Sequence, residues 1–129
     1  MKHLKRFNEN KLNESFEEFS SDVDDALAFI KDEGFNVRVL KFDNISNNNY
    51  FTIKVIKDDK TSFNIDQIKT DVLTMLSQFT TDLNYEISYI YILKDENGSN
   101  KRDMIEFEDL RELSGDIKQF AIEFKDNNI

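Results

Sequence analysis

Carboxylates are the residues of this chain that come in groups able to do chemistry. Such groups bind hard divalent cations or act as general acid and base. Each group here has a simpler explanation, because it falls in the first turn of a predicted helix, in a predicted turn, or on the outer face of a predicted helix. We therefore expect no metal site, catalytic site or cofactor at any of them. They are Asp22/Asp24/Asp25, Asp58/Asp59, Asp95/Glu96 and Glu106/Glu108/Asp109/Glu112.

The other residue types that enzymes use are scarce. His3 is the only histidine, and it lies in a short basic segment, far in sequence from any hydroxyl it could activate. The absence of cysteine excludes disulfides, thiolate metal sites and thiol nucleophiles. Three glycines are too few for a glycine-rich loop around a phosphate. These observations favour a protein that is not an enzyme.

Tyrosines crowd one predicted strand, residues 85–93. Alternation places Tyr85, Tyr89 and Tyr91 on one face, with Ile90 and Ile92 on the other. Because both faces are partly apolar, the strand is expected to be central or to form an interface. Tyr85, Tyr89 and Tyr91 are therefore our candidate interface residues, and a homodimer through the sheet is one way to use them.

The same tyrosines, with Phe51 or Phe120, could stack on nucleobases as in sheet-based RNA readers. Such surfaces need flanking basic residues, and this part of the sequence has few. The formal net charge of −9 also disfavours contact with phosphates. We therefore expect a protein partner and not a nucleic acid.

Periodicity predicts the elements that must position these residues. Apolar residues recur every three or four positions over residues 15–33 and 64–81, which predicts two amphipathic helices. Gly34 is suited to end the first helix, and Asn64 to cap the second. Strands are predicted over residues 35–42, 50–56, 85–93 and 117–124. Met104 and Ile105 could continue a strand, but a short helix over residues 106–113 is favoured.

This order predicts an α+β fold. It is a two-layer sandwich with two main helices packed on a mostly antiparallel four-stranded sheet, in the order α-β-β-α-β-short α-β. The 129 residues suit one domain, residues 15–129, preceded by a basic arm, residues 1–14. No apolar run is long enough to span a membrane.

The arm carries a charge opposite to that of the body. Residues 1–11 contain four Lys/Arg and one acid, whereas the rest contains thirteen Lys/Arg and twenty-five acids. Such a difference in charge between a short segment and the rest of the chain is typical of a targeting signal or a binding arm. The arm residues that combine charge with isolated apolar side chains and Asn/Glu are Lys2, Leu4, Lys5, Arg6, Phe7, Asn8 and Glu9.

This opening, MKHLKRFNEN, resembles the N-terminal peptides of small proteins of large tailed bacteriophages. The resemblance implies that the arm directs the protein into the assembling head. It also implies cleavage by a head-maturation protease after Glu in a Leu-x-Glu pattern. Leu12 and Glu14 fit this pattern at the arm–body boundary, and the segment 110–112 fits it as well. The segment 34–37, Gly-Phe-Asn-Val, is similar to one in other phage proteins.

Two hypotheses for function follow. The first is a non-enzymatic phage protein, a cargo or accessory protein of the virion head, whose arm docks it to a scaffold or shell protein. The second is an acidic interaction module or DNA mimic that binds a host protein in the host cytoplasm. The second requires carboxylates spread over a continuous face with little apolar cover.

Overall fold

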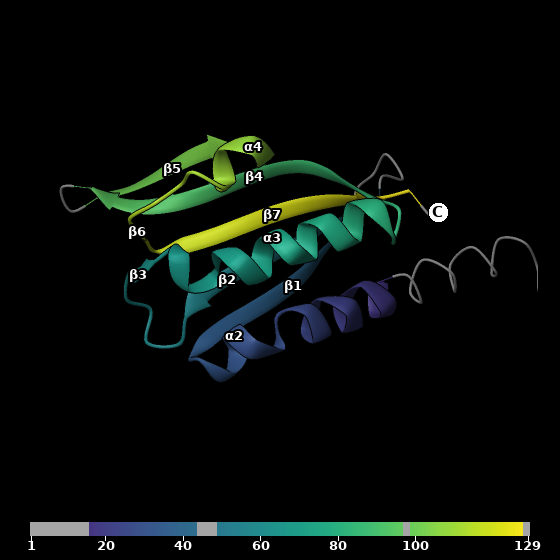
Figure 1. Ribbon diagram of the computed structural model, residues 1–129, viewed down its shortest axis with the longest axis horizontal. Coiled ribbons are helices and arrows are strands. Elements are labelled where there is room, and N and C mark those ends of the chain that lie inside the picture. The colour runs from purple at the N-terminus through teal and green to yellow at the C-terminus, as the bar shows by residue number, and fades with distance from the viewer. Residues whose placement is uncertain (1–15, 44–48, 97–98, 128–129) are drawn as a thin grey trace, which may run out of the picture.

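The structure is a computed structural model that describes residues 16–43, 49–96 and 99–127. Two main helices lie side by side over one face of a sheet in which every strand pair is antiparallel (Figure 1). The predicted α+β class, with two main helices on an antiparallel sheet, is confirmed. The first of these helices comprises residues 16–26 and α2. The labelled elements are α2 (Ala28–Asp32), β1 (Phe35–Asp43), β2 (Asn49–Lys57), β3 (Phe63–Asn64), α3 (Asp66–Thr81), β4 (Tyr85–Glu96), β5 (Ser99–Ile105), α4 (Phe107–Leu110), β6 (Asp116–Ile117) and β7 (Gln119–Asp126).

The main sheet has five strands in the order β1-β2-β7-β4-β5, so the prediction of four strands is wrong. The additional strand is β5, whose residue Ser99 pairs with Glu96 at the end of β4. The favoured short helix is also present, as α4, directly after β5. A second sheet holds only β3 and β6. Because β7 lies between β2 and β4, it joins the hairpin β1–β2 to the hairpin β4–β5.

The first main helix is interrupted at Leu27, where the backbone leaves helical geometry. The helical hydrogen-bond pattern still crosses this point, because the Leu27 N–H donates to the Val23 carbonyl and the Lys31 N–H donates to the Leu27 carbonyl. Gly34 has a φ of +95°, the left-handed conformation expected of the residue that follows a helix. This turn leads directly into β1.

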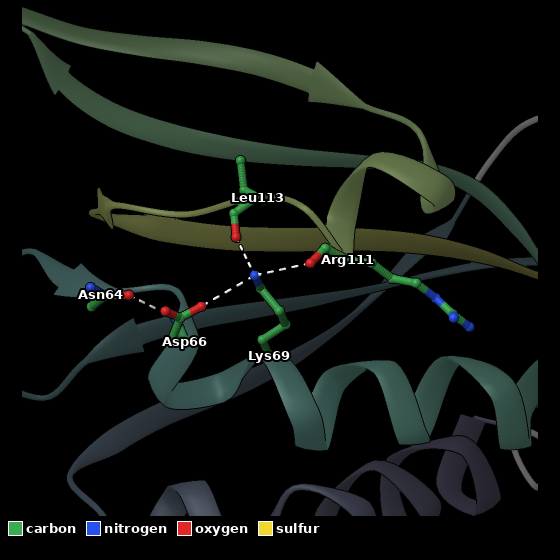
Figure 2. Close-up of polar contacts among 5 residues, drawn as sticks. All are labelled: Asn64, Asp66, Lys69, Arg111 and Leu113. Carbon is green, nitrogen blue, oxygen red and sulfur yellow. Dashed lines mark hydrogen bonds and ion pairs between the residues drawn. The ribbon is translucent and has the colours of Figure 1, made fainter.

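Helix α3 begins at Asp66, and its start is fixed by polar side chains (Figure 2). The side-chain oxygen of Asn64 accepts the Asp66 N–H at 2.9 Å, but the N-cap of α3 is Ile65, one residue later than predicted, and has no side-chain cap. The Lys69 ammonium pairs with the Asp66 carboxylate at 3.2 Å and donates to the carbonyls of Arg111 and Leu113. Lys69 therefore ties α3 to the segment between α4 and β6.

The core lies between the two main helices and the sheet. Phe19 is fully buried at its centre, with its ring centroid 4.8 Å from that of Phe51, 5.6 Å from Phe79 and 5.8 Å from Phe124. These four rings come from the first helix, β2, α3 and β7, so one cluster joins both helices to the middle of the sheet. Burial of this apolar surface is the main stabilising contribution to the fold.

Candidate functional site

The three candidate tyrosines do not share a face of the sheet. The register between β4 and β7 shifts between Ile87 and Tyr89, so Ser88 is an extra residue that forms a β-bulge. An extra residue reverses which face the following side chains take. Tyr85 therefore faces the helices, whereas Tyr89 and Tyr91 face the opposite side, and the prediction that all three lie together is wrong.

Tyr85 is a core residue, 6% exposed, and its ring contacts those of Phe19, Phe79 and Phe124. Burial raises the pKa of its hydroxyl, and the nearby carboxylate of Asp126 raises it further. Ile90 and Ile92, which follow the bulge, are buried on the same helix side. Phe51 and Phe120 also lie in this core, so neither can stack on a ligand beside Tyr89 and Tyr91.

Within the described residues, the elements outside the main sheet all pack on its helix side. One core receives buried side chains from all of these elements. Leu27 and Leu76 come from the two main helices, Leu110 from α4 and Ile117 from the small β3–β6 sheet. No described helix therefore lies over the opposite face, which we call the bare face. Its residues are Asn36, Arg38, Leu40, Tyr50, Thr52, Lys54, Ile56, Glu86, Tyr89, Tyr91, Leu93, Arg102, Met104, Gln119, Ala121, Glu123 and Lys125.

Two tyrosines form the centre of an ordered cluster on the bare face. The rings of Tyr89 and Tyr91 are stacked, with centroids 6.0 Å apart and planes inclined by 25°. The Arg102 guanidinium carbon lies 4.2 Å from the Tyr91 ring centroid, a cation–π contact. The side-chain amide of Gln119 donates to the Tyr91 hydroxyl oxygen at 3.4 Å. Tyr91 is thus held from three sides and is only 4% exposed.

Tyr89 is half-buried, and its ring is stacked on that of Tyr91. Burial raises the pKa of Tyr89, and the adjacent carboxylate of Glu123 raises it further. Tyr89 also pairs with Glu123 across β4 and β7. The ring is therefore positioned before any ligand arrives, while part of its surface remains accessible.

The strand register sets these side chains in a row across the sheet. Met104 pairs with Tyr91, Tyr91 with Ala121, Ala121 with Lys54, and Lys54 with Arg38. Met104 is 60% exposed, one of the two large apolar residues that are exposed in the described part of the chain. One row therefore runs from an exposed apolar side chain, over an aromatic ring, to two cations.

Charge is distributed unequally between the two sides of the sheet. Of the bare-face residues named above, four are basic, Arg38, Lys54, Arg102 and Lys125, and two are acidic, Glu86 and Glu123; the register also places Asp95 of β4 at a position of this face. In contrast, residues 16–33 of the helical layer carry seven acidic side chains and one basic side chain. The net charge of −9 therefore does not describe the bare face.

A buried hydroxyl lies within the bare face. Thr52 is 3% exposed, and its Oγ1 has no hydrogen-bond partner among the residues that the structure describes. Its register partners are Leu40 on β1 and Glu123 on β7. A buried hydroxyl without a hydrogen-bond partner costs the fold free energy.

The remaining candidate residues fall elsewhere. The arm residues Lys2 to Glu9 and the candidate processing residues Leu12 and Glu14 lie outside the described residues. Among residues 16–43, 49–96 and 99–127, no group of three or more His, Cys, Asp or Glu side chains is arranged to hold a metal ion. In the same part of the chain, no helix has the length and apolar character that crossing a membrane requires.

Sequence reasoning missed the partners of the tyrosines. Arg102, Met104 and Gln119 come from β5 and β7, and only the strand register brings them to Tyr91. One signal for the bulge was present in the sequence. The apolar positions 85 and 87 are out of phase with Ile90 and Ile92, and the polar Ser88 stands between the two pairs.

Comparison of the chain with protein-family models, with curated protein sequences and with solved structures found no match.

Proposed function

We propose that this protein is a non-enzymatic binding protein of a tailed bacteriophage, carried in the virion head as a cargo or accessory protein. Its basic arm docks it to a scaffold or shell protein during head assembly. Its folded body then acts through the bare face. The arm's part in this proposal rests on the sequence of residues 1–14 and its resemblance to phage targeting peptides.

One observation carries the proposal for the body: the preorganised tyrosine cluster on a sheet face that no described helix covers. Tyr91 is held by Arg102 and Gln119, and the ring of Tyr89 is stacked on that of Tyr91. Aromatic and arginine side chains are enriched at binding hot spots because they bury a large area at little entropic cost. Positioned in this way, they suit recognition of a partner.

The test of the arm is the protein content of purified virions. In a phage that encodes this protein without residues 2–11, infected cells should contain the folded body, but the heads should not. Intact-mass measurement on wild-type virions should give a mature N-terminus at Ser15 if Glu14 is the processing site. Equal packaging of the deleted and wild-type proteins would refute head targeting by the arm.

The helical layer supports a second candidate function, an acidic module or DNA mimic that binds a basic host protein. Carboxylates on Glu17, Glu18, Asp24 and Asp25 are exposed on the first main helix, which has one basic residue, Lys31. Such a partner should be captured at low salt and lost at high salt. Two sets of variants separate the two functions. If replacing these four carboxylates with amides abolishes capture, and changes on the bare face do not, the second function is favoured over the first.

A further inference from the structure

We propose that the bare face binds single-stranded nucleic acid, with a base stacked on Tyr89 and the phosphates of the same strand on Arg102, Lys54 and Arg38. This inference rests on the binding role proposed above for that face. It names the chemical class of the partner.

The stacking surface is already assembled. Proteins that bind single strands combine aromatic side chains, on which bases stack, with cations that follow the backbone. Tyr89 presents a half-buried ring that is stacked on Tyr91, so little side-chain freedom is lost when a base packs against it. The exposed Met104, cross-strand neighbour of Tyr91, offers an apolar contact for a second base.

The cations lie along a path that a strand could follow. Lys54 and Arg38 stand two and three strands away from Tyr91 in one register row. With neighbouring strands ~4.8 Å apart, their backbones are about 10 Å and about 14 Å from that of Tyr91. Arg102 lies beside Tyr91 on its other side. A nucleic acid that crosses the sheet would meet stacking rings near β4 and phosphate contacts at both ends.

Charge complementarity favours this occupant over a second copy of the chain. Two bare faces would bring the same excess of basic side chains together, whereas a phosphate backbone neutralises it. The carboxylates of the helical layer are separated from the bare face by the sheet and the core, a distance comparable to or greater than the Debye length of about 8 Å at physiological salt. In a duplex, the faces of the bases are stacked on one another and cannot pack on Tyr89. Binding of a single strand is therefore favoured over binding of a duplex.

The experiment measures binding of the full-length protein to fluorescein-labelled oligothymidylate by fluorescence anisotropy. An oligouridylate and a DNA duplex of the same length serve as parallel probes, and the first distinguishes DNA from RNA. If three phosphates are contacted, affinity should fall about 20-fold between 50 and 200 mM salt. The duplex should bind more weakly than either single strand.

Matched variants identify the surface that binds. Tyr89→Ala should weaken binding by about 5-fold or more, as expected when one stacked base is lost. Arg102→Gln and Lys54→Gln should each weaken binding and flatten its salt dependence. The controls are Phe29→Ala, which removes a 65% exposed ring from the helical layer, and Lys31→Gln, which removes an exposed cation there. Both controls should bind like the wild type.

Either of two results would overturn the inference. The first is no measurable binding of single strands at 50 mM salt by a protein with wild-type circular dichroism. The second is binding that survives Tyr89→Ala and Arg102→Gln, since the basic arm is present in every variant and would then be the binding element. In both cases the head-packaging test above is unaffected, so failure of this inference is distinguishable from failure of the proposed function.

Discussion

The two faces of the five-stranded sheet are built from the same strands but hold different kinds of residue. On the helix side, Phe51, Ile53 and Val55 of β2 meet Phe120, Ile122 and Phe124 of β7 in a continuous apolar layer. On the bare face, the intervening residues are mostly tyrosines, cations and small or polar side chains. An antiparallel sheet can keep one face toward solvent because side chains alternate along each strand. The difference separates what holds the fold together from what is available for binding.

The two faces also differ in how a cation is used. On the helix side, Lys69 is held by backbone carbonyls and a carboxylate, and its side chain is 16% exposed (Figure 2). On the bare face, Arg102 is exposed and rests on an aromatic ring. The first arrangement joins two segments of the chain. The second leaves hydrogen-bond donors free to meet an anion, because a cation–π contact uses the face of the guanidinium and not its N–H groups.

Deletion of Ser88 should have the largest effect, because without this residue β4 can no longer place the side chains on both sides of the bulge on their present faces. Without the bulge, either Tyr85 and Ile87 or Ile90 and Ile92 must leave the core, at a cost of roughly 3–6 kcal/mol for two large apolar side chains. This loss approaches the whole stability of a typical domain. Urea unfolding should show a large drop in midpoint or no cooperative transition. Ser88→Ala, which keeps the bulge, is the control and should unfold near the wild-type midpoint.

Truncation of one aromatic ring on each face should lower the free energy of unfolding by unequal amounts. Phe19→Ala removes a fully buried ring that contacts Phe51, Phe79 and Phe124, and we expect a loss of about 3–5 kcal/mol in the free energy of unfolding. Tyr89→Ala removes a half-buried ring from the bare face and should cost about 1 kcal/mol or less. Chemical denaturation of the two variants measures both values. Equal losses would mean that the bare face contributes to stability as the core does.

Replacement of one cation on each face should separate their roles. Lys69→Ala should lower the free energy of unfolding by about 2 kcal/mol, because it leaves the carbonyls of Arg111 and Leu113 without their charged donor. Arg102→Gln should cost at most about 1 kcal/mol, the value of an exposed cation–π contact. Thermal unfolding followed by circular dichroism can rank the pair. A larger loss for Arg102→Gln would contradict the assignment of Arg102 to binding.

The smallest expected effect concerns the acidic helical layer. Partial burial raises the pKa of Asp22 above its usual value of 3.8, and the carboxylates of Glu18 and Asp25 raise it further. Ionised Asp22 therefore opposes folding at neutral pH, and this cost disappears as the pH falls through the raised pKa toward 3.8. Asp22→Asn should stabilise the protein at pH 7 by less than about 1 kcal/mol, since the site is mostly solvated.

The check is urea unfolding of Asp22→Asn at low salt across pH 4–7. The gain over the wild type should be greatest at neutral pH and should shrink toward pH 4. Asp24→Asn is the matched control, because the Asp24 carboxylate pairs with Lys31 at 3.1 Å and its loss should bring no gain. A gain of equal size for both variants would point to a general charge effect in place of a local one.

Sequence reasoning predicted the elements that have strong apolar periodicity and missed those that lack it. The stripe Ile68, Val72, Met75, Leu76 and Phe79 predicts α3, and these residues are its buried face. By contrast, β5 reads Ser-Asn-Lys-Arg-Asp-Met-Ile, and as an edge strand it needs only Ile105 packed against the core. Edge strands are commonly polar, which protects them from unwanted pairing. Apolar residues therefore indicated a strand only at Met104 and Ile105, the end of β5.

The candidate site was less predictable than the fold for a related reason. Tyr89 and Tyr91 were predicted as candidates from their strand, but their grouping with Tyr85 ignored the bulge at Ser88. Their partners Arg102 and Gln119 are set by pairings between strands that are distant in sequence. Net charge gives no information on one face alone, because it sums the residues on both sides of the sheet. Only the register shows which charges share a face with the tyrosines.

The central position of β7 has a consequence for synthesis of the protein on the ribosome. The hairpins β1–β2 and β4–β5 share no strand pairing until residues 119–126 emerge and insert between them. Before that moment, the nascent chain exposes the inner edges of β2 and β4 together with much of the future core, a state in which edge pairing with other chains is a hazard. The main sheet is therefore completed only after β7 has been synthesised, in a step that closes contacts between residues more than sixty positions apart, such as Phe51 and Phe124.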